Sequence, residues 1–243
     1  MNGVRAVLFD KDGTLIDAFA GWIAINHRLF HELKRRYPHP GSESDFRASL
    51  GITGSQALPG GLLSSGTEEE LYRAHHRLLG ESAPAWEVFH AETAALAHEL
   101  FHSAPPPVVP RGRVKHTLAA LKLRGYRLGL ATSDSFANAQ RDLGPHGADL
   151  LEFWATADRL THPKPHPESV LRFCEAVGVL PSEVAFVGDS PVDLETARNA
   201  GVACFLAVCS PTCPPEVLAA ADFVLETVED LLEHLDVAGE GPV

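Results

Sequence analysis

Two kinds of hydrophobic pattern follow one another along the chain. Residues 6–9 form a short apolar run with the length of a strand that is buried on both faces. Residues 19–37, 44–50, 68–79 and 85–102 then show apolar positions at helical spacing, whereas residues 51–66 are rich in Gly, Ser and Pro, as loops are. The pattern predicts one strand followed by a long helical segment, residues 18–107.

Strands and helices alternate over the rest of the chain. Apolar runs predict strands at residues 126–131, 151–155, 184–187, 202–208 and 223–225. Helices are predicted at residues 113–124, 137–143, 167–177, 193–200, 215–220 and 228–235. This alternation favours a doubly wound parallel sheet with right-handed crossovers. We expect an α/β core of residues 1–17 and 108–243, interrupted after its first strand by an inserted α-helical cap domain of residues 18–107.

Composition and charge narrow the class of protein. The chain has 243 residues, enough for one large or two modest domains, and a net charge of −12, which argues against a nucleic-acid or anionic-membrane partner. No apolar run approaches the roughly 18 residues of a transmembrane helix. We expect no signal peptide, because the first strand begins within a few residues of Met1. We expect a cytoplasmic protein. The four cysteines form no C-x-x-C pair, which favours free thiols over a zinc or redox site.

The first strand ends in two carboxylates, Asp10 and Asp12. The carboxyl edge of a parallel sheet is where ligands bind, and a carboxylate there can attack an electrophile if a cation offsets the repulsion from an anionic substrate. Asp12 is placed to serve as general acid and base. Gly13 lets the backbone approach a ligand, and Thr14 offers a hydroxyl and an N–H to phosphate oxygens. The alternative is an ordinary Asp-Gly turn with solvated acids.

Three further polar stretches follow predicted strands or precede helices. Thr132 and Ser133 follow the apolar residues 128–131, Lys164 lies between two prolines, and Asp189 and Asp193 follow residues 184–187. Each has an ordinary explanation as a helix cap, a solvated lysine or a turn acid. Those explanations do not account for the convergence of acid, hydroxyl, ammonium and acid at one predicted sheet edge.

The pattern Asp10-x-Asp12-Gly13-Thr14, followed by residues 128–133, Lys164-Pro165 and residues 187–193, resembles the haloacid dehalogenase-like hydrolases, specifically their phosphoglycolate phosphatase-like branch. The resemblance covers nearly the whole chain and is weakest over the helical insertion. It implies a helical cap at this point of the chain, which can act as a lid over the carboxyl edge, exclude water and select substrates.

The resemblance also implies a role for each motif residue. The Thr132 hydroxyl and the Ser133 backbone N–H bind the transferring phosphoryl group, and the Lys164 ammonium stabilises charge on the nucleophile and on that group. Asp189 binds the metal directly, with Asp193 in the metal site or close beside it. The expected cofactor is Mg²⁺, which takes oxygen ligands, and the Asp10 carboxylate and the Asp12 backbone carbonyl complete the protein's ligand set.

The expected activity is Mg²⁺-dependent hydrolysis of a small phosphorylated metabolite, phosphoglycolate-like or a sugar phosphate. Asp10 attacks phosphorus, Asp12 protonates the leaving oxygen, and Asp12 then activates the water that hydrolyses the aspartyl-phosphate. The alternatives are a phosphomutase of the β-phosphoglucomutase type and a non-catalytic protein that binds a phosphometabolite. Asp12 disfavours a dehalogenase and, with the absence of transmembrane segments, an ion-pumping ATPase.

Other polar residues receive smaller roles. Lys11 is expected to point away from the site and is assigned no chemistry. Arg47 and Gly51 resemble an Arg-then-Gly feature of the family's cap, which makes Arg47 a candidate substrate contact. His162 and His166 are interpreted as local structure rather than as ligands.

Overall fold

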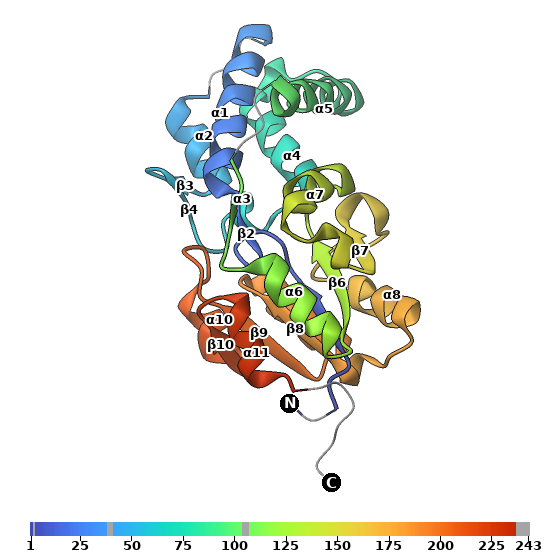
Figure 1. Cartoon of the computed structure of the whole chain (residues 1–243). Coiled ribbons are helices and arrows are strands. Elements are labelled where there is room, and N and C mark those ends of the chain that lie inside the picture. Colours follow the sequence, from blue (N-terminus) through green and yellow to red (C-terminus); the bar gives the residue numbers. More distant parts are fainter. Residues whose placement is uncertain (2, 38–40, 104–106, 237–243) are drawn as a thin grey trace. The chain divides into compact units, whose positions relative to one another are not determined.

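A computed structural model describes residues 1, 3–37, 41–103 and 107–236. The chain folds into two compact units, each of which is visible in the ribbon of Figure 1. The core unit consists of Met1–Asp17 and Val109–Val243, and the inserted unit of Ala18–Val108. Within the described ranges, no helix combines the length and the apolar character needed to cross a membrane.

The core unit contains a six-stranded sheet in the order β10-β9-β8-β1-β6-β7, in which every neighbouring pair is parallel. Its strands are β1 (Ala6–Phe9), β6 (Arg127–Thr132), β7 (Phe153–Thr156), β8 (Val184–Gly188), β9 (Cys204–Val208) and β10 (Phe223–Leu225). All residues of β1, β8 and β9 are buried, because helices cover both faces of the sheet. The predicted α/β parallel sheet is confirmed.

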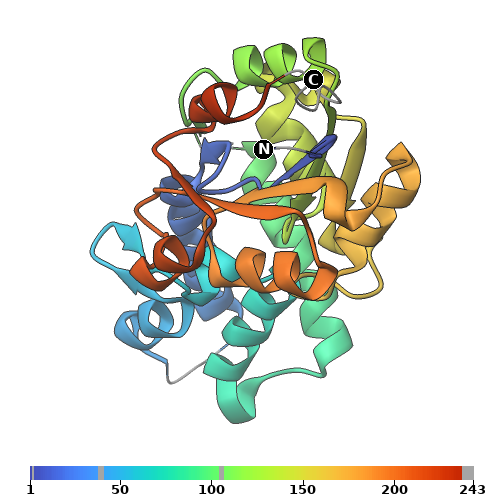
Figure 2. The ribbon, with the colours of Figure 1, turned by 90° about the horizontal axis from the view of Figure 1, so that it is seen from below.

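Helices lie on both sides of this sheet. One apolar cluster joins Leu8 and Phe186 to the helices α8 (Glu168–Val177), α9 (Pro191–Ala200) and α10 (Pro215–Ala220). Figure 2 shows α6 (Val114–Leu123) and α11 (Leu231–His234) on one side of the strands and α9 on the other. The helix α7 (Phe136–Leu143) follows β6, and 3₁₀ turns occur at Gly144–His146, Ala148–Leu150, Ala157–Arg159, Pro181–Glu183 and Val228–Asp230.

The inserted unit is mainly helical. It contains α1 (Phe19–Arg36), α2 (Glu43–Leu50), α3 (Leu62–Ser65), α4 (Glu68–Leu79), a 3₁₀ turn at Gly80–Ser82 and α5 (Trp86–Ser103). The helix α1 packs on two sides: Phe30 joins a cluster with α2 and α3, whereas Leu29 and Leu33 join a cluster with α4 and α5. The predicted helices are therefore present, and α1 links the two apolar clusters of this unit.

The region predicted as a loop, residues 51–66, contains more structure than expected. A short hairpin pairs β3 (Ile52–Thr53) with β4 (Gln56–Ala57), and α3 follows it. Gly54 has φ of +57°, so it supports a reversal that other residues rarely adopt. Strands of two residues are too short to show an alternating pattern, which is why the sequence did not reveal them.

A second two-stranded sheet marks both ends of the insertion. In the core unit β2 (Ile16–Asp17) pairs antiparallel with β5 (Val109–Pro110). The chain thus leaves the core unit and re-enters it through neighbouring strands, so the insertion does not interrupt the six-stranded sheet.

Gly129 is required by the packing of β6 against α8. A Cβ added there would lie 2.7 Å from the Phe173 ring and 3.0 Å from Leu8 Cδ1. We expect Gly129→Ala to lower the free energy of unfolding by about 1–3 kcal/mol because the buried neighbours must shift, as measured by urea unfolding. Gly144→Ala is the control, since nothing lies within 4 Å of its Cβ position and its φ is −45°; it should be neutral or stabilise by about 0.4–1 kcal/mol. Equal destabilisation by the two variants would show that the close neighbours of Gly129 do not cause the loss of stability in Gly129→Ala.

Candidate active site

Asp10 lies directly after β1, at the carboxyl edge of the sheet. Its backbone N–H donates to the Val187 carbonyl of β8 at 2.8 Å, and its side chain is buried. Gly13, with φ of +83°, turns the chain back, and its N–H donates to the Ile16 carbonyl at 2.7 Å. A Cβ on Gly13 would collide with the Asp189 carboxylate. Glycine is thus required here because the first motif and Asp189 approach each other closely.

Lys164 connects two of the predicted acids. Its Nζ donates to Asp10 Oδ1 at 2.7 Å and to Asp193 Oδ1 at 2.6 Å, and the ammonium is buried between them. Lys164 belongs to the segment between β7 and α8, so it reaches the site from the same edge of the sheet as Asp10. We refer to Lys164, Asp10 and Asp193 as the Lys164 cluster.

Asp189 and Asp193 follow β8 and are fixed by hydroxyl groups. Asp189 Oδ2 accepts hydrogen bonds from Ser210 Oγ and, at 2.8 Å, from Thr212 Oγ1. Asp193 Oδ2 accepts from the Ser190 Oγ at 2.6 Å and from the Ser190 N–H at 3.1 Å, in the capping box that begins α9. The helix begins at Pro191 rather than at Asp193, because proline suits the first helical position after a serine cap.

Asp10, Asp189 and Asp193 form a compact set of carboxylates. One oxygen from each lies within 4.8 Å of the others, and all three residues are buried. Burial raises the pKa of Asp10 well above its ordinary value, the charge of Asp193 raises it further, and Lys164 opposes this. Burial and Asp193 raise the pKa of Asp189 to about 7, against the hydrogen bonds from Ser210 and Thr212. The site concentrates negative charge on oxygen donors, so it could hold a divalent metal ion.

Asp12 belongs to a second group of charges, and the prediction that Lys11 points away is wrong. Lys11 is fully buried, and its Nζ lies 3.0 Å from Asp12 Oδ2, 3.0 Å from Asp134 Oδ2 and 2.8 Å from Asp142 Oδ2. Asp142, one of these partners, belongs to α7. We refer to these four residues, Lys11, Asp12, Asp134 and Asp142, as the Lys11 cluster.

The Lys11 cluster sets the environment of the predicted general acid and base. Burial raises the pKa of Asp12 to about 6, although the Lys11 ammonium lowers it; Asp134 and Asp142 raise it. The three carboxylates also hold the pKa of Lys11 above its ordinary value, although burial alone would lower it. The Asp12 side chain therefore faces Lys11 and is not part of the three-carboxylate set. Its metal contact through the backbone carbonyl stays a prediction.

The predicted phosphate-binding residues lie at the ends of β6 and of the first turn. Thr132 is the last residue of β6, and its buried Oγ1 accepts from the Asp134 N–H at 3.2 Å. Ser133 follows it at an intermediate exposure. Thr14 is buried, and within the described part of the chain its Oγ1 has no hydrogen-bond partner. Their contacts with a phosphoryl group stay predictions.

Arg47 lies on α2 of the inserted unit. Its Nη2 donates to the Gly54 carbonyl in the β3–β4 turn. Arg47 therefore ties the hairpin to α2, and a contact with substrate stays a prediction.

Sequence reasoning missed several polar residues of the site, namely Lys11, Asp134, Asp142, Ser210 and Thr212. The sequence does carry a signal for two of them. Ser210 and Thr212 follow β9, the neighbour of β8, so the strand-end argument that found Asp189 applies equally to them. Asp142 gives no such signal, because it lies within α7 and its partner is 131 residues away in the sequence.

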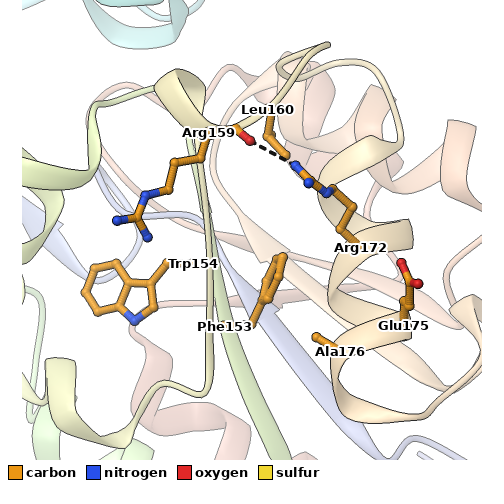
Figure 3. Close-up of a pocket in the computed structure, with 7 residues that line it drawn as sticks. All are labelled: Phe153, Trp154, Arg159, Leu160, Arg172, Glu175 and Ala176. Atoms are coloured by element: carbon orange, nitrogen blue, oxygen red, sulfur yellow. Dashed lines mark hydrogen bonds between the residues drawn. The ribbon is translucent and has the colours of Figure 1, made fainter.

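A pocket of about 350 Å³ lies elsewhere in the core unit, between β7 and α8. Figure 3 shows its lining residues, among them Phe153, Trp154 and Ala176 and two arginines. Arg172 Nη1 donates a hydrogen bond to the Arg159 carbonyl at 2.8 Å. Both guanidinium groups are engaged, since Arg172 also pairs with Glu168 and Arg159 lies over the Phe136 ring. None of the predicted site residues lines this pocket.

Comparisons with known proteins agree with the geometry of the core unit. A model of the haloacid dehalogenase-like hydrolase family matches residues 4–201. The chain belongs to this family. It is 31% identical over 198 residues to a protein named probable phosphatase IndB from Dickeya dadantii, covering 81% of this chain and 78% of that protein. It is also 28% identical over 207 residues to the phosphoglycolate phosphatase of Escherichia coli, covering 82% and 79%.

Solved structures share the fold. A predicted phosphoglycolate phosphatase from Haemophilus somnus has a TM-score of 0.75 at 20% identity and covers 96% of this chain and 99% of its own. A candidate β-phosphoglucomutase from Thermotoga maritima has a TM-score of 0.65 at 23% identity, covering 95% and 98%. The branch predicted from the motifs, the phosphoglycolate phosphatase-like hydrolases, is confirmed. The chain is a hydrolase that acts on phosphoric monoester bonds.

The ion pairs of the Lys11 cluster predict that removing the Lys11 ammonium lowers the stability of the protein strongly. Lys11→Met leaves three carboxylates near one another without the ammonium, and we expect the free energy of unfolding to fall by about 3–5 kcal/mol, as measured by urea unfolding. The control, Lys115→Met, removes an exposed lysine and should change little. The double variant Lys11→Met/Asp142→Asn should recover part of the loss, since it also removes one of the stranded charges. A Lys11→Met protein as stable as the control would show that the three carboxylates do not depend on the ammonium.

The raised pKa values predict how stability depends on pH. The folded, metal-free protein keeps protons on Asp10 and Asp189 that the unfolded chain loses near the ordinary value of 3.8. The free energy of unfolding should therefore fall as pH rises from that value through about 7, by about 1.4 kcal/mol for each unit by which a pKa is raised. In EDTA, thermal unfolding should occur at a lower temperature at about pH 7.5 than at about pH 5.5.

Two comparisons identify the carboxylates as the source of this trend. Asp189→Asn should flatten it, because the amide does not ionise. MgCl₂ should raise the unfolding temperature more at the higher pH, since a cation favours the ionised carboxylates. The same slope in the Asp189→Asn variant would show that other groups cause it.

Proposed function

We propose that this protein is a Mg²⁺-dependent phosphatase that hydrolyses a small phosphomonoester through an aspartyl-phosphate on Asp10. The observation that carries the proposal is the bridging of Asp10 and Asp193 by the buried Lys164 ammonium, beside Asp189. A nucleophilic carboxylate, a cation for the transferring group and a set of oxygen donors are together at one sheet edge. The family match and the phosphatase relatives support the same chemistry.

The roles of the protein's own side chains follow from their surroundings. Asp10 is the nucleophile, since its carboxylate lies at the strand end next to Lys164, which neutralises part of the charge of an approaching phosphoryl group. Asp12 protonates the leaving oxygen and then takes a proton from the attacking water. A pKa near 6 suits both tasks close to neutral pH. Thr132, Ser133, Gly13 and Thr14 are the proposed contacts for the phosphoryl oxygens.

The residues present fit a magnesium ion. Asp10, Asp189 and Asp193 offer only carboxylate oxygens. Burial, and then the charge of Asp193, raise the pKa values of Asp10 and Asp189, so a bound cation would favour their ionised forms. When bound, Mg²⁺ would supply the charge that lets an anionic carboxylate approach an anionic ester. Asp10 and Asp189 are the proposed direct ligands, with the Asp12 backbone carbonyl, and Asp193 as a ligand or a close neighbour that also holds Lys164.

We also propose that the inserted unit, Ala18–Val108, is the cap that selects the substrate, with Arg47 as one contact. Phosphoglycolate-like esters and sugar phosphates are the candidate substrates. The relative named phosphoglycolate phosphatase supports the first class.

The test compares phosphate release by the wild type and by Asp10→Asn from a panel of phosphomonoesters and sugar phosphates, with Mg²⁺ and with EDTA. We expect Mg²⁺-dependent release that falls at least about a thousandfold in Asp10→Asn, because the amide cannot form the covalent intermediate. Asp149→Asn, which changes an exposed aspartate of the core unit, should keep wild-type activity.

Two other outcomes would overturn the proposal. Isomerisation of a sugar phosphate without release would identify a phosphomutase. Saturable binding of an ester without turnover would identify a binding protein.

Mass spectrometry of the acid-quenched wild type should find the phosphoryl group on the peptide that contains Asp10.

A further inference from the structure

Two histidines and a glutamate converge on the surface of the inserted unit, and the proposed phosphatase chemistry does not use them. His27 and His31 lie four residues apart on α1, so they share one face of the helix, and Glu43 is the first residue of α2. His27 Nε2 lies 3.3 Å from His31 Nε2 and 3.1 Å from Glu43 Oε1. One atom from each side chain lies within 4.8 Å of the other two.

Hydrogen bonds alone do not account for this arrangement. If His27 Nε2 carries a hydrogen, it can donate to Glu43 but has no lone pair left for His31. If His27 Nε2 lacks the hydrogen, it can accept from His31, but its lone pair then faces the Glu43 carboxylate. In either tautomer at most one hydrogen lies between His27 Nε2 and its two neighbours, so two ordinary two-centre hydrogen bonds cannot form at once. A cation between the three atoms satisfies both contacts at once.

Two of the three separations match those of ligands around a tetrahedral ion, and the third lies within 4.8 Å. Zinc–nitrogen bonds of about 2.0–2.1 Å place two ligand atoms of a tetrahedron roughly 3.3 Å apart. The two separations from His27 Nε2, 3.3 and 3.1 Å, are close to this value. Imidazole nitrogen with one carboxylate is a donor set for zinc and its neighbours in the first transition row, whereas Mg²⁺ prefers oxygen alone.

Each histidine ring lies against one aromatic side chain of the inserted unit. The His31 ring meets Phe30 edge to face at 5.5 Å, and the His27 ring lies 6.3 Å from Phe46. Phe30 and Phe46 in turn stack at 4.6 Å and join α1 to α2 in the apolar cluster below. The ligands thus rest on a packed base, which lowers the entropy lost when an ion binds.

A second group of similar composition provides a contrast. His162, His166 and Glu168 also lie close together in the core unit. There the Glu168 carboxylate already accepts hydrogen bonds from the backbone N–H groups of Thr161 and His162, and His166 Nδ1 accepts from the Glu168 N–H. The oxygen atoms of Glu168 and the Nδ1 atom of His166, which could otherwise bind a metal ion, thus already accept hydrogen bonds from the backbone. For the Glu43 carboxylate, in contrast, the polar partner within the described chain is His27, one of the three residues of the group.

We propose that His27, His31 and Glu43 form a binding site for a divalent first-row transition metal of the zinc type. The ion joins α1 to α2 and leaves one tetrahedral position open. Because all three ligands belong to the inserted unit, bound metal stabilises that unit directly.

The experiment is a titration of the full-length protein with ZnCl₂ by isothermal calorimetry. The protein is first stripped with EDTA, desalted and saturated with Mg²⁺, so that the carboxylate set of the core unit is occupied. We compare the wild type with His27→Gln/His31→Gln and Glu43→Gln. The matched control is His162→Gln/His166→Gln, which removes two histidines from the other group.

We expect the wild type and the control to bind one equivalent of Zn²⁺ with the same affinity. The His27→Gln/His31→Gln variant should bind this equivalent at least about tenfold more weakly, and Glu43→Gln should also weaken it, since even residues that only support metal ligands contribute that much. Zn²⁺ should raise the thermal unfolding temperature of the wild type and of the control but not that of the double variant. Equal unfolding temperatures without metal verify that the variants fold.

Three results would overturn the proposal: no Zn²⁺ binding by the Mg²⁺-saturated wild type, unchanged affinity in His27→Gln/His31→Gln, or a loss confined to the control. None of them bears on Asp10 or on phosphate release, so the failure of this site and the failure of the phosphatase proposal are distinguishable.

Discussion

Negative charge buried at the carboxyl edge of the sheet is the constraint on which the candidate active site depends. Six aspartates gather there: Asp10, Asp12, Asp134, Asp142, Asp189 and Asp193. Moving each carboxylate out of water costs several kcal/mol unless a partner compensates it. Two buried lysines form ion pairs with these carboxylates, Lys164 in one cluster and Lys11 in the other. Ser210 and Thr212 donate hydrogen bonds to Asp189. The compensation is incomplete: burial, and then the charge of Asp193, still raise the pKa values of Asp10 and Asp189.

The division between two lysines gives the two acids of the first motif different surroundings. Asp10 shares its ammonium with Asp193 and lies in the three-carboxylate set, whereas Asp12 faces Lys11. On the proposed mechanism, a cation bound by the carboxylate set would lower the pKa of Asp10 and favour the ionised nucleophile. Asp12, set by the Lys11 cluster, would keep a pKa near 6 and hold the proton for the leaving group. On this proposal, one acid–x–acid motif would supply both the nucleophile and the general acid.

The sequence predicted those parts of the fold and of the candidate site that depend on local patterns. The strands β1 and β8 were recognisable because burial on both faces requires continuous apolar runs, and the placement of Asp10 and Asp189 after them followed from sheet topology. The hairpin of β3 and β4 was not predicted, because strands of two residues are too short to show an alternating hydrophobic pattern. Lys11 escaped for a different reason: a lysine is normally exposed, and its burial here depends on Asp142, which only the tertiary fold brings near.

The two metal sites proposed for this chain differ in the atoms that they offer to an ion. The carboxylate set of the core unit offers oxygen alone and suits a hard ion such as Mg²⁺, whereas His27, His31 and Glu43 offer imidazole and suit zinc-type ions. The ligands of the first come from the segments that follow β1 and β8, with Asp193 in the first turn of α9, so that site exists only when the sheet has formed. The ligands of the second come from α1 and α2, which are close in sequence and share the Phe30–Phe46 contact. A transition metal bound by His27, His31 and Glu43 would therefore act on the cohesion of the inserted unit, and magnesium on the chemistry of the core unit.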